Sequence, residues 1–235
     1  MIDKEKSDLQ ERVVRLYLRL NGFITDGFIA HSPTHGNNLS EIDVIGVRFP
    51  YHSESEREVP ICKQLNIQDG KIYIIVGEVK SNGQRVSFNK ALKNNIDVTR
   101  KAINRIGFIH PKNLESALVK IHELVQDTAF NKEGPAQYEI PSTEYSVSAV
   151  IFKPETNERD AAKEFFITGP DIMNYMWDCF KPEKARCGCA TIYNFALWGE
   201  FEEIVRYVKS ANKREDLNME SLYSHIEKLK IKNTR

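Results

Sequence analysis

The sequence predicts a mixed α/β fold in which a sheet is flanked by helices and followed by further helices at the C-terminal end. Two apolar runs with strand character, residues 40–47 and 71–79, lie among segments whose apolar side chains recur at helical spacing. The 235 residues are 41% hydrophobic, which is enough for one sizeable core. We therefore expect a core domain over residues 1–180 and a helical extension over residues 181–235 packed on it.

The N-terminal elements are expected in the order helix, strand, strand, strand. Ser7, with Gln10 three residues later, has the pattern of a capping box, and the apolar helical spacing that follows stops at Asn21-Gly22. This predicts a helix over residues 9–20. The expected strands cover residues 23–30, 40–47 and 71–79, with a polar loop over residues 50–70.

After Lys80 the pattern becomes mainly helical. Apolar residues recur among basic side chains up to residue 106, and Gly169-Pro170-Asp171 is typical of a helix start. The expected helices cover residues 91–106, 114–125, 169–177, 193–210 and 219–230. Two more strands are expected at residues 145–152 and 164–168.

The charge balance restricts the possible classes of function. Lys and Arg together number 33, as do Asp and Glu, so the formal net charge is zero at pH 7. Any binding of nucleic acid must therefore depend on local basic patches. No apolar run approaches the roughly 20 residues that cross a bilayer, and the N-terminus lacks the apolar stretch of a signal peptide. These observations predict a cytoplasmic protein with no membrane partner.

The cysteine and histidine spacings do not favour a zinc site. Cys187-Gly188-Cys189 is one residue short of a Cys-x2-Cys pair. The other two cysteines, Cys62 and Cys179, are far apart in the sequence and do not form a second ligand pair. His31 and His35 have ligand-like spacing, but no third His or Cys joins them. We expect reduced thiols instead. The sequence also lacks a nucleophile-elbow serine and a phosphate-binding glycine loop, which argues against acyl hydrolases and ATPases.

Both apolar runs carry acidic residues, and a charge inside a sheet core is costly unless a ligand compensates for the lost hydration. Asp43 lies within the first run, and Glu78-Val79-Lys80 ends the second. Alternate strand residues face the same side, so Glu78 and Lys80 project together. If the two strands pair, Asp43 and Glu78 can hold one Mg²⁺ ion, with water and a substrate phosphate as further ligands. Lys80 can then hold the attacking water or the developing negative charge.

This arrangement resembles the bipartite Asp…Glu-x-Lys signature of the PD-(D/E)XK phosphodiesterases, the restriction-endonuclease-like superfamily. Many members also carry a glutamate in a first helix, and Glu11, eleven residues before Gly22-Phe23, is similar to it. The resemblance covers residues 7–105. It departs from the family pattern at Ile42, where a proline is usual, and requires an inserted hairpin or loop at residues 50–70.

The resemblance implies a restriction-endonuclease-like sheet flanked by helices and metal-dependent hydrolysis of phosphodiester bonds. It implies Asp43, Glu78 and the Val79 carbonyl as metal ligands, Lys80 as a catalytic residue and Glu11 as a helper in catalysis. Mg²⁺ is the implied cofactor, with Mn²⁺ as a substitute. The expected activity is that of a DNA endonuclease, with RNA left open as a substrate. A homodimer or a partner subunit is a further expectation, by analogy with the two strands of a duplex.

The segment after Lys80 offers candidate contacts to nucleic acid. It is rich in basic residues and contains a single acid, Asp97. The candidate binding residues are Arg85, Lys90, Lys93, Arg100 and Lys101. Neutral donors suited to sugar and phosphate are Ser81, Asn82, Ser87 and Asn89, with Gln84 as a further phosphate contact. The alternative is a solvated face of charge-rich helix.

Two other interpretations of the sequence remain open. A chain with 33 acidic residues offers Glu-x-Lys triplets without catalytic meaning, and a strand with Glu and Lys at its exposed end is common at sheet edges. In that case the protein is a catalytically inactive module that binds nucleic acid or another protein. In the other interpretation, the helices at residues 193–210 and 219–230 mediate assembly with a partner protein.

Overall fold

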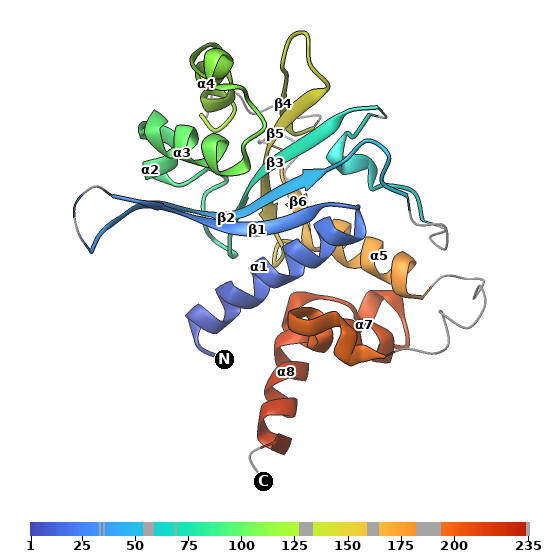
Figure 1. Ribbon diagram of the computed structural model, residues 1–235. Coiled ribbons are helices and arrows are strands. Elements are labelled where there is room, and N and C mark those ends of the chain that lie inside the picture. Colours follow the sequence, from blue (N-terminus) through green and yellow to red (C-terminus); the bar gives the residue numbers. More distant parts are fainter. Residues whose placement is uncertain are drawn as a thin grey trace.

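The computed structural model describes residues 1–32, 34, 36–53, 59–68, 70–126, 134–158, 165–181 and 194–233 (Figure 1). The strands are β1 (Ile24–His31), β2 (Asn38–Arg48), β3 (Ile72–Val79), β4 (Ala136–Glu139), β5 (Tyr145–Lys153) and β6 (Ile167–Thr168). The α-helices are α1 (Asp3–Leu20), α2 (Lys90–Asn94), α3 (Ile96–Ile106), α4 (Leu114–Glu123), α5 (Gly169–Phe180), α7 (Glu202–Ser210) and α8 (Met219–Asn233). A 3₁₀ segment, η4 (Phe195–Phe201), leads into α7.

Within the described residues these strands form a six-stranded mixed sheet, which confirms the predicted fold class. The strand order is β1-β2-β3-β5-β4, and β6 also pairs with β5. The β3–β5 and β5–β6 pairs are parallel, whereas β1–β2, β2–β3 and β4–β5 are antiparallel. In Figure 1, α2, α3 and α4 cover one face of the sheet, and α1 and α5 cover the other, with α7 and α8 beyond them.

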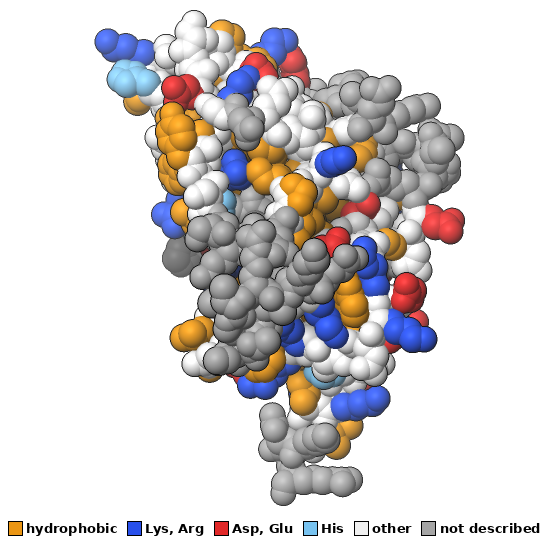
Figure 2. All heavy atoms as spheres, turned by 90° about the vertical axis from the view of Figure 1, so that its right-hand side faces the viewer, with side chains coloured by type: hydrophobic (Ala, Val, Ile, Leu, Met, Phe, Trp, Pro, Cys, Tyr) orange, Lys and Arg blue, Asp and Glu red, His pale blue; other side chains and the backbone are white. Residues whose placement is uncertain are grey.

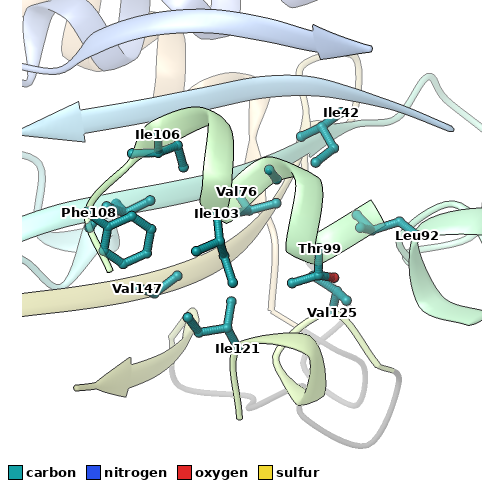
Figure 3. A pocket seen from close by; sticks show the side chains of 12 residues that line it. Ile42, Val76, Leu92, Thr99, Ile103, Ile106, Phe108, Ile121, Val125 and Val147 are labelled. Carbon is teal, nitrogen blue, oxygen red and sulfur yellow. The ribbon is translucent and has the colours of Figure 1, made fainter. Parts of the chain in front are cut away.

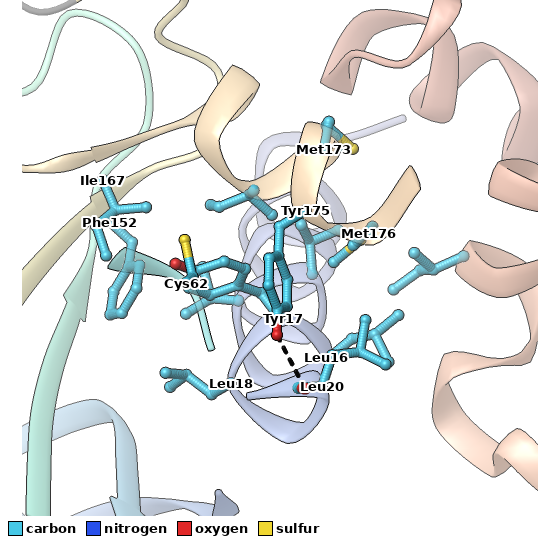
Figure 4. Packing of buried hydrophobic residues seen from close by; sticks show 14 of the residues in the cluster. Leu16, Tyr17, Leu18, Leu20, Cys62, Phe152, Ile167, Met173, Tyr175 and Met176 are labelled. Carbon is cyan, nitrogen blue, oxygen red and sulfur yellow. Dashed lines mark hydrogen bonds between the residues drawn. The ribbon is translucent and has the colours of Figure 1, made fainter. Parts of the chain in front are cut away.

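The larger core lies between the sheet, α1 and α5. Tyr17 of α1 packs edge-on against Tyr175 of α5, with ring centroids 5.5 Å apart, and meets Phe152 of β5 on another side (Figure 4). The Tyr175 hydroxyl donates to the Leu20 carbonyl at 3.3 Å. Apolar residues of α7 and α8 belong to the same cluster, so hydrophobic burial holds the C-terminal helices against the core.

A second core lies between the sheet, α3 and α4. Ile103 of α3 and Ile121 of α4 lie close to Val76 of β3 (Figure 3). The cavity among these side chains has a volume of only ≈ 10 Å³, so it is a packing defect and not a ligand site. The buried Thr99 hydroxyl and His122 Nδ1 are hydrogen-bonded at 2.9 Å.

Some helix boundaries differ from the prediction. α1 begins at Asp3 instead of residue 9, and Ser7, the predicted N-cap, lies inside it. The acidic Asp3 and Glu5 favour this earlier start because they face the positive end of the helix dipole. The predicted helix at residues 193–210 is not continuous: the 3₁₀ segment η4, with Gly199 at a non-helical φ of 55° inside it, precedes α7.

Strand β4 was missed from the sequence. It is a short edge strand, and its side chains are partly exposed, so it lacks the alternating apolar pattern of a half-buried strand. Pro135 and Pro141 flank it and made the segment resemble a loop.

Several predicted features lie outside the described residues, namely His35, Cys187, Cys189, and the starts of the predicted strand at residue 164 and helix at residue 193. Cys62 and Cys179 form no disulfide in the described part of the chain. No helix within the described ranges is long and apolar enough to cross a membrane. On the face in Figure 2, side chains of both charge signs are scattered, in line with the zero net charge.

Candidate active site

The candidate site lies where β2 and β3 separate. Their antiparallel pairing runs from Arg48–Tyr73 to Val44–Gly77 and stops there. On its other edge, β2 stays paired with β1 as far as Asn38. The β1–β2 hairpin therefore continues past the end of β3, as Figure 1 shows. We call the point of separation the β2–β3 fork.

A β-bulge in β2 coincides with the fork. Asp26 of β1 pairs with Ile45, and Phe28 pairs with Ile42, so one intervening residue of β1 faces two of β2. The two residues of β2 are Asp43 and Val44. Bulges re-aim side chains and are frequent next to active sites. Here the bulge changes the side-chain alternation at Asp43.

Asp43 is bound directly to the segment that carries the second half of the motif. Its Oδ2 accepts the backbone N–H of Val79 at 2.7 Å. The N–H and C=O of one strand residue leave the strand on the same side, so the Val79 carbonyl also faces the β2 side of the fork. The N–H of the next residue, Lys80, turns the other way and donates to the Phe152 carbonyl of β5 at 2.8 Å.

Glu78 of β3 and Lys80, the first residue after β3, meet, as their alternate positions in the sequence predicted. Lys80 Nζ donates to Glu78 Oε1 in a close ion pair. The Glu78 side chain is 4% exposed and that of Lys80 is 17% exposed. The strand thus holds a buried carboxylate under a partly open ammonium group.

Burial and mutual repulsion raise the pKa values of the carboxyl groups at the fork. Burial, followed by the charge of Asp43, raises the pKa of Glu78 to about 7, although Lys80 and the backbone of Asn89 lower it. Burial likewise raises the pKa of Asp43, against the hydrogen bond from Val79 and the charge of Lys80. A bound cation would relieve this repulsion and favour both charged forms.

Helix α1 brings Glu11 to the same place. Burial, followed by the charges of Asp43 and Glu41, raises the pKa of Glu11 to about 7. At about 100° per residue, Glu11 lies nearly opposite the main apolar stripe of α1, which contains Leu9 and Val13. Helix α1 is nevertheless buried on a second side, because Val14 and Leu18 are fully buried. Glu11 can therefore face the fork without facing solvent.

Asn89 occupies the fork as well, although the sequence analysis placed it among the contacts to sugar and phosphate. It is the N-cap of α2, accepting from the Leu92 N–H at 2.8 Å. Its side chain also contacts Ser40 and Glu41 of β2 and Glu78 of β3. Asparagine is a common N-cap residue, so its place at the start of a helix could be expected from the sequence. No local pattern indicated that its side chain would contact β2 and β3.

The loop after Lys80 is held by its own Gln84 and by two residues that were not predicted for the site, Lys153 and Glu155. The Gln84 side chain, predicted as a phosphate contact, accepts the Ser81 N–H at 3.0 Å, and the phosphate contact stays a prediction. The buried Lys153 donates to the Gln84 carbonyl at 2.9 Å. Glu155 accepts the Asn82 N–H at 2.7 Å. Lys153 is the last residue of β5, and Glu155 lies two residues beyond it. They are distant from the loop in the sequence and come close to it because β5 pairs with β3 in the sheet.

Two further supports come from the helices. Gln10 of α1 is 1% exposed, and its Oε1 accepts the Ser81 hydroxyl at 3.2 Å. Tyr223 of α8 accepts from Gln10 Nε2 at 2.8 Å and donates to Glu155 Oε1 at 2.8 Å. The C-terminal helix therefore contributes to the support of the loop that follows the Glu-x-Lys segment.

The candidate nucleic-acid-binding residues are not equivalent. Arg85 and Lys90 are exposed, while Lys93 is partly buried and donates to the Ser87 hydroxyl at 2.7 Å. Arg100 and Lys101 lie on α3, where Arg100 pairs with two acids. That pairing makes Arg100 the weakest candidate of the set.

The donor set at the fork fits a hard divalent cation. Two carboxylates and a backbone carbonyl are the oxygen ligands that Mg²⁺ accepts, and it usually keeps several waters besides. Among the described residues, no three His, Cys, Asp or Glu side chains are grouped so as to hold a metal ion. A site built on Asp43 and Glu78 alone therefore depends on the Val79 carbonyl, water and a substrate phosphate for its remaining ligands.

No family model matches the sequence, and comparisons with curated proteins and with solved structures find no similar protein. Membership of the PD-(D/E)XK superfamily therefore stays a prediction, which rests on the residues at the fork.

Proposed function

We propose that this protein is a divalent-metal-dependent nuclease of the PD-(D/E)XK type that hydrolyses phosphodiester bonds in DNA. The observation that carries the proposal is the hydrogen bond from the Val79 N–H to Asp43, because it joins two halves of a motif 36 positions apart. Glu78 and Lys80 flank Val79 and are ion-paired with each other. The pKa of Glu78 is raised by burial and by the charge of Asp43, and a bound cation would offset both effects.

Each residue has a role in the proposed reaction. Asp43, Glu78 and the Val79 carbonyl would hold Mg²⁺, or Mn²⁺ in its place. When bound, such an ion polarises the phosphate and acidifies a bound water. The ammonium group of Lys80 is placed to orient that water or to stabilise the negative charge that develops. Glu11, with a pKa of about 7, is suited to transfer a proton near neutral pH.

The start of α2 suggests where the substrate backbone lies. Asn89 contacts Glu78, and Lys90 follows it on the surface. Lys93 lies one turn further along the helix, and Arg85 is exposed in the loop before it. These cations support contact with the phosphates on either side of the scissile bond.

A cleavage assay with DNA and RNA substrates in Mg²⁺ and in Mn²⁺ tests the proposal. We expect metal-dependent cleavage of DNA that falls about 100-fold or more in Lys80→Ala. Lys71→Ala is the matched control, because Lys71 lies at the other end of β3 and pairs with Glu139 at 2.5 Å. Absence of cleavage with either metal, or full activity in Lys80→Ala, would refute the proposal.

The second candidate function is a catalytically inactive module that binds nucleic acid or a protein. It is favoured by the lack, among the described side chains, of a group of three metal-ligating residues. Mn²⁺ titration separates the two functions. Saturable binding that depends on Glu78 supports the enzyme, and its absence supports the inactive module.

A further inference from the structure

Asn89 uses both ends of its side-chain amide at the fork. Its Oδ1 accepts from the Leu92 N–H at 2.8 Å and from the Ser40 hydroxyl at 3.0 Å. Its Nδ2 donates to the Glu41 carbonyl at 2.8 Å and to Glu78 Oε2 at 3.4 Å. The Leu92 N–H can only donate and the Glu41 carbonyl can only accept, so these two partners fix which end of the amide faces which group.

These hydrogen bonds lie where the backbone pairing of β2 and β3 has ended. The β2–β3 ladder has ended at Val44–Gly77, so no ladder bond joins Glu41 on β2 to Glu78 on β3. Asn89 bridges the two strands across that gap. The bond to the Glu41 carbonyl is short and the bond to Glu78 is long. The position of the amide is therefore set mainly by β2 and α2, and its second N–H points to the Glu78 carboxylate.

The Glu78 carboxylate is thereby held at both oxygens. Lys80 occupies Oε1, and Asn89 approaches Oε2. Lys80 is a flexible side chain, whereas Asn89 is anchored by the cap of α2. The orientation of the carboxylate plane therefore depends chiefly on Asn89, through its side-chain amide and through the backbone hydrogen bond that lowers the pKa of Glu78.

We propose that Asn89 is a positioning residue that orients the Glu78 carboxylate toward the metal. The proposal rests on the proposed metal-dependent function and assigns Asn89 to the protein side of the site, not to the substrate. Partners of this kind, which hydrogen-bond to a metal ligand, commonly contribute about 10-fold to 100-fold in metal affinity.

Asn89→Ser tests this role, because serine keeps the N-cap acceptor and removes the Nδ2 donor. The matched control is Asn95→Ser. Asn95 is the N-cap of α3 and accepts from the Asp97 N–H at 3.0 Å. The measurements are the Mn²⁺ dissociation constant by calorimetry, kcat and KM separately, and the Glu78 rotamer in metal-free crystals of each variant.

We expect Asn89→Ser to raise the Mn²⁺ dissociation constant about 10-fold or more and to lower kcat at saturating DNA, with KM for DNA unchanged. Asn95→Ser should change none of these. The metal-free crystals should show Glu78 turned away from its wild-type rotamer in Asn89→Ser alone. The backbone N–H of residue 89 is kept in this variant, so an unchanged rotamer would overturn the positioning role of the Asn89 side-chain amide. A wild-type protein that binds no Mn²⁺ would instead refute the metal-dependent function, while the rotamer would still decide what Asn89 does.

Discussion

The Asp43 carboxylate accepts the Val79 N–H at 2.7 Å immediately beyond the last ladder pair of β2 and β3. A side chain thus takes over the acceptor role that the backbone of β2 would otherwise fill. One residue is thereby both a structural partner of β3 and a candidate metal ligand. Its two roles can be separated experimentally, because only the second needs a charge.

Asp43→Asn should keep the fold and lose the metal. The asparagine Oδ1 can still accept the Val79 N–H, so we expect the melting temperature of the metal-free protein to fall by no more than a few degrees. Loss of the charge should weaken Mn²⁺ binding beyond detection in a calorimetric titration. Asp26→Asn on β1 is the control, since Asp26 Oδ1 accepts only a local N–H, that of Gly27 at 2.9 Å. Equal Mn²⁺ affinity in the two variants would contradict the ligand role.

Gly77→Ala should destabilise the sheet next to the site. A Cβ at Gly77 would lie 2.4 Å from Val44 Cγ1 and 3.0 Å from Phe152 Cε2, and both neighbours are fully buried. Overpacking of this kind costs about 2 kcal/mol or more in the free energy of unfolding. Gly27→Ala is the control, because its Cβ meets nothing closer than 3.6 Å. Urea denaturation measures both, and equal stability of the two variants would show that the fork is loosely packed.

The metal-free protein should lose stability as the pH rises from about 4.5 to about 7. Glu78 has a pKa of about 7 when folded against 4.5 as the reference, so the folded state retains a proton that the unfolded chain has lost. Stability therefore falls with pH across this window, by an amount of the order of 3 kcal/mol for a buried carboxyl group. Glu11 acts in the same direction.

Thermal unfolding at several pH values checks this dependence. Glu78→Gln should flatten the profile and raise the melting temperature at pH 8, whereas Glu139→Gln, on the half-exposed edge strand β4, should not. Mn²⁺ should stabilise the wild type at pH 8 but not at pH 4.5, because protons then compete with the metal. A profile that rises between pH 4.5 and 7 in the metal-free wild type would contradict the raised pKa values.

Tyr223→Phe should loosen the loop after Lys80 from a distance. It removes a hydroxyl that links Gln10 to Glu155, and Glu155 holds the Asn82 N–H. We expect a loss of about 1–3 kcal/mol in stability, since one partner is a charged group. Hydrogen exchange of the Asn82 amide should also become faster. Tyr51→Phe is the control because Tyr51 is 91% exposed. If the Asn82 amide also exchanged faster in Tyr51→Phe, the effect would not be specific to the Tyr223 hydroxyl.

The candidate site was partly readable from the sequence. Period-two alternation required Glu78 and Lys80 to share a side of their strand, and the apolar runs located Asp43 and Glu78 on strands. The same pattern gave the order of the first four elements. It could not show that Glu11 lies near Asp43. The helical pattern indicates which side chains are apolar, but not which other element each side of the helix packs against.

The sequence by itself determined the elements and the residue types that they carry, because helix and strand periodicity are local properties of the chain. Only the tertiary structure decided that the ladder ends one pair before Asp43, that a bulge displaces this residue, and that Asn89 bridges the gap. It also decided that Tyr223, near the C-terminal end, supports a loop at residues 81–84. These are contacts between residues far apart in the chain, and the register of strand pairing that creates them depends on how the whole core packs.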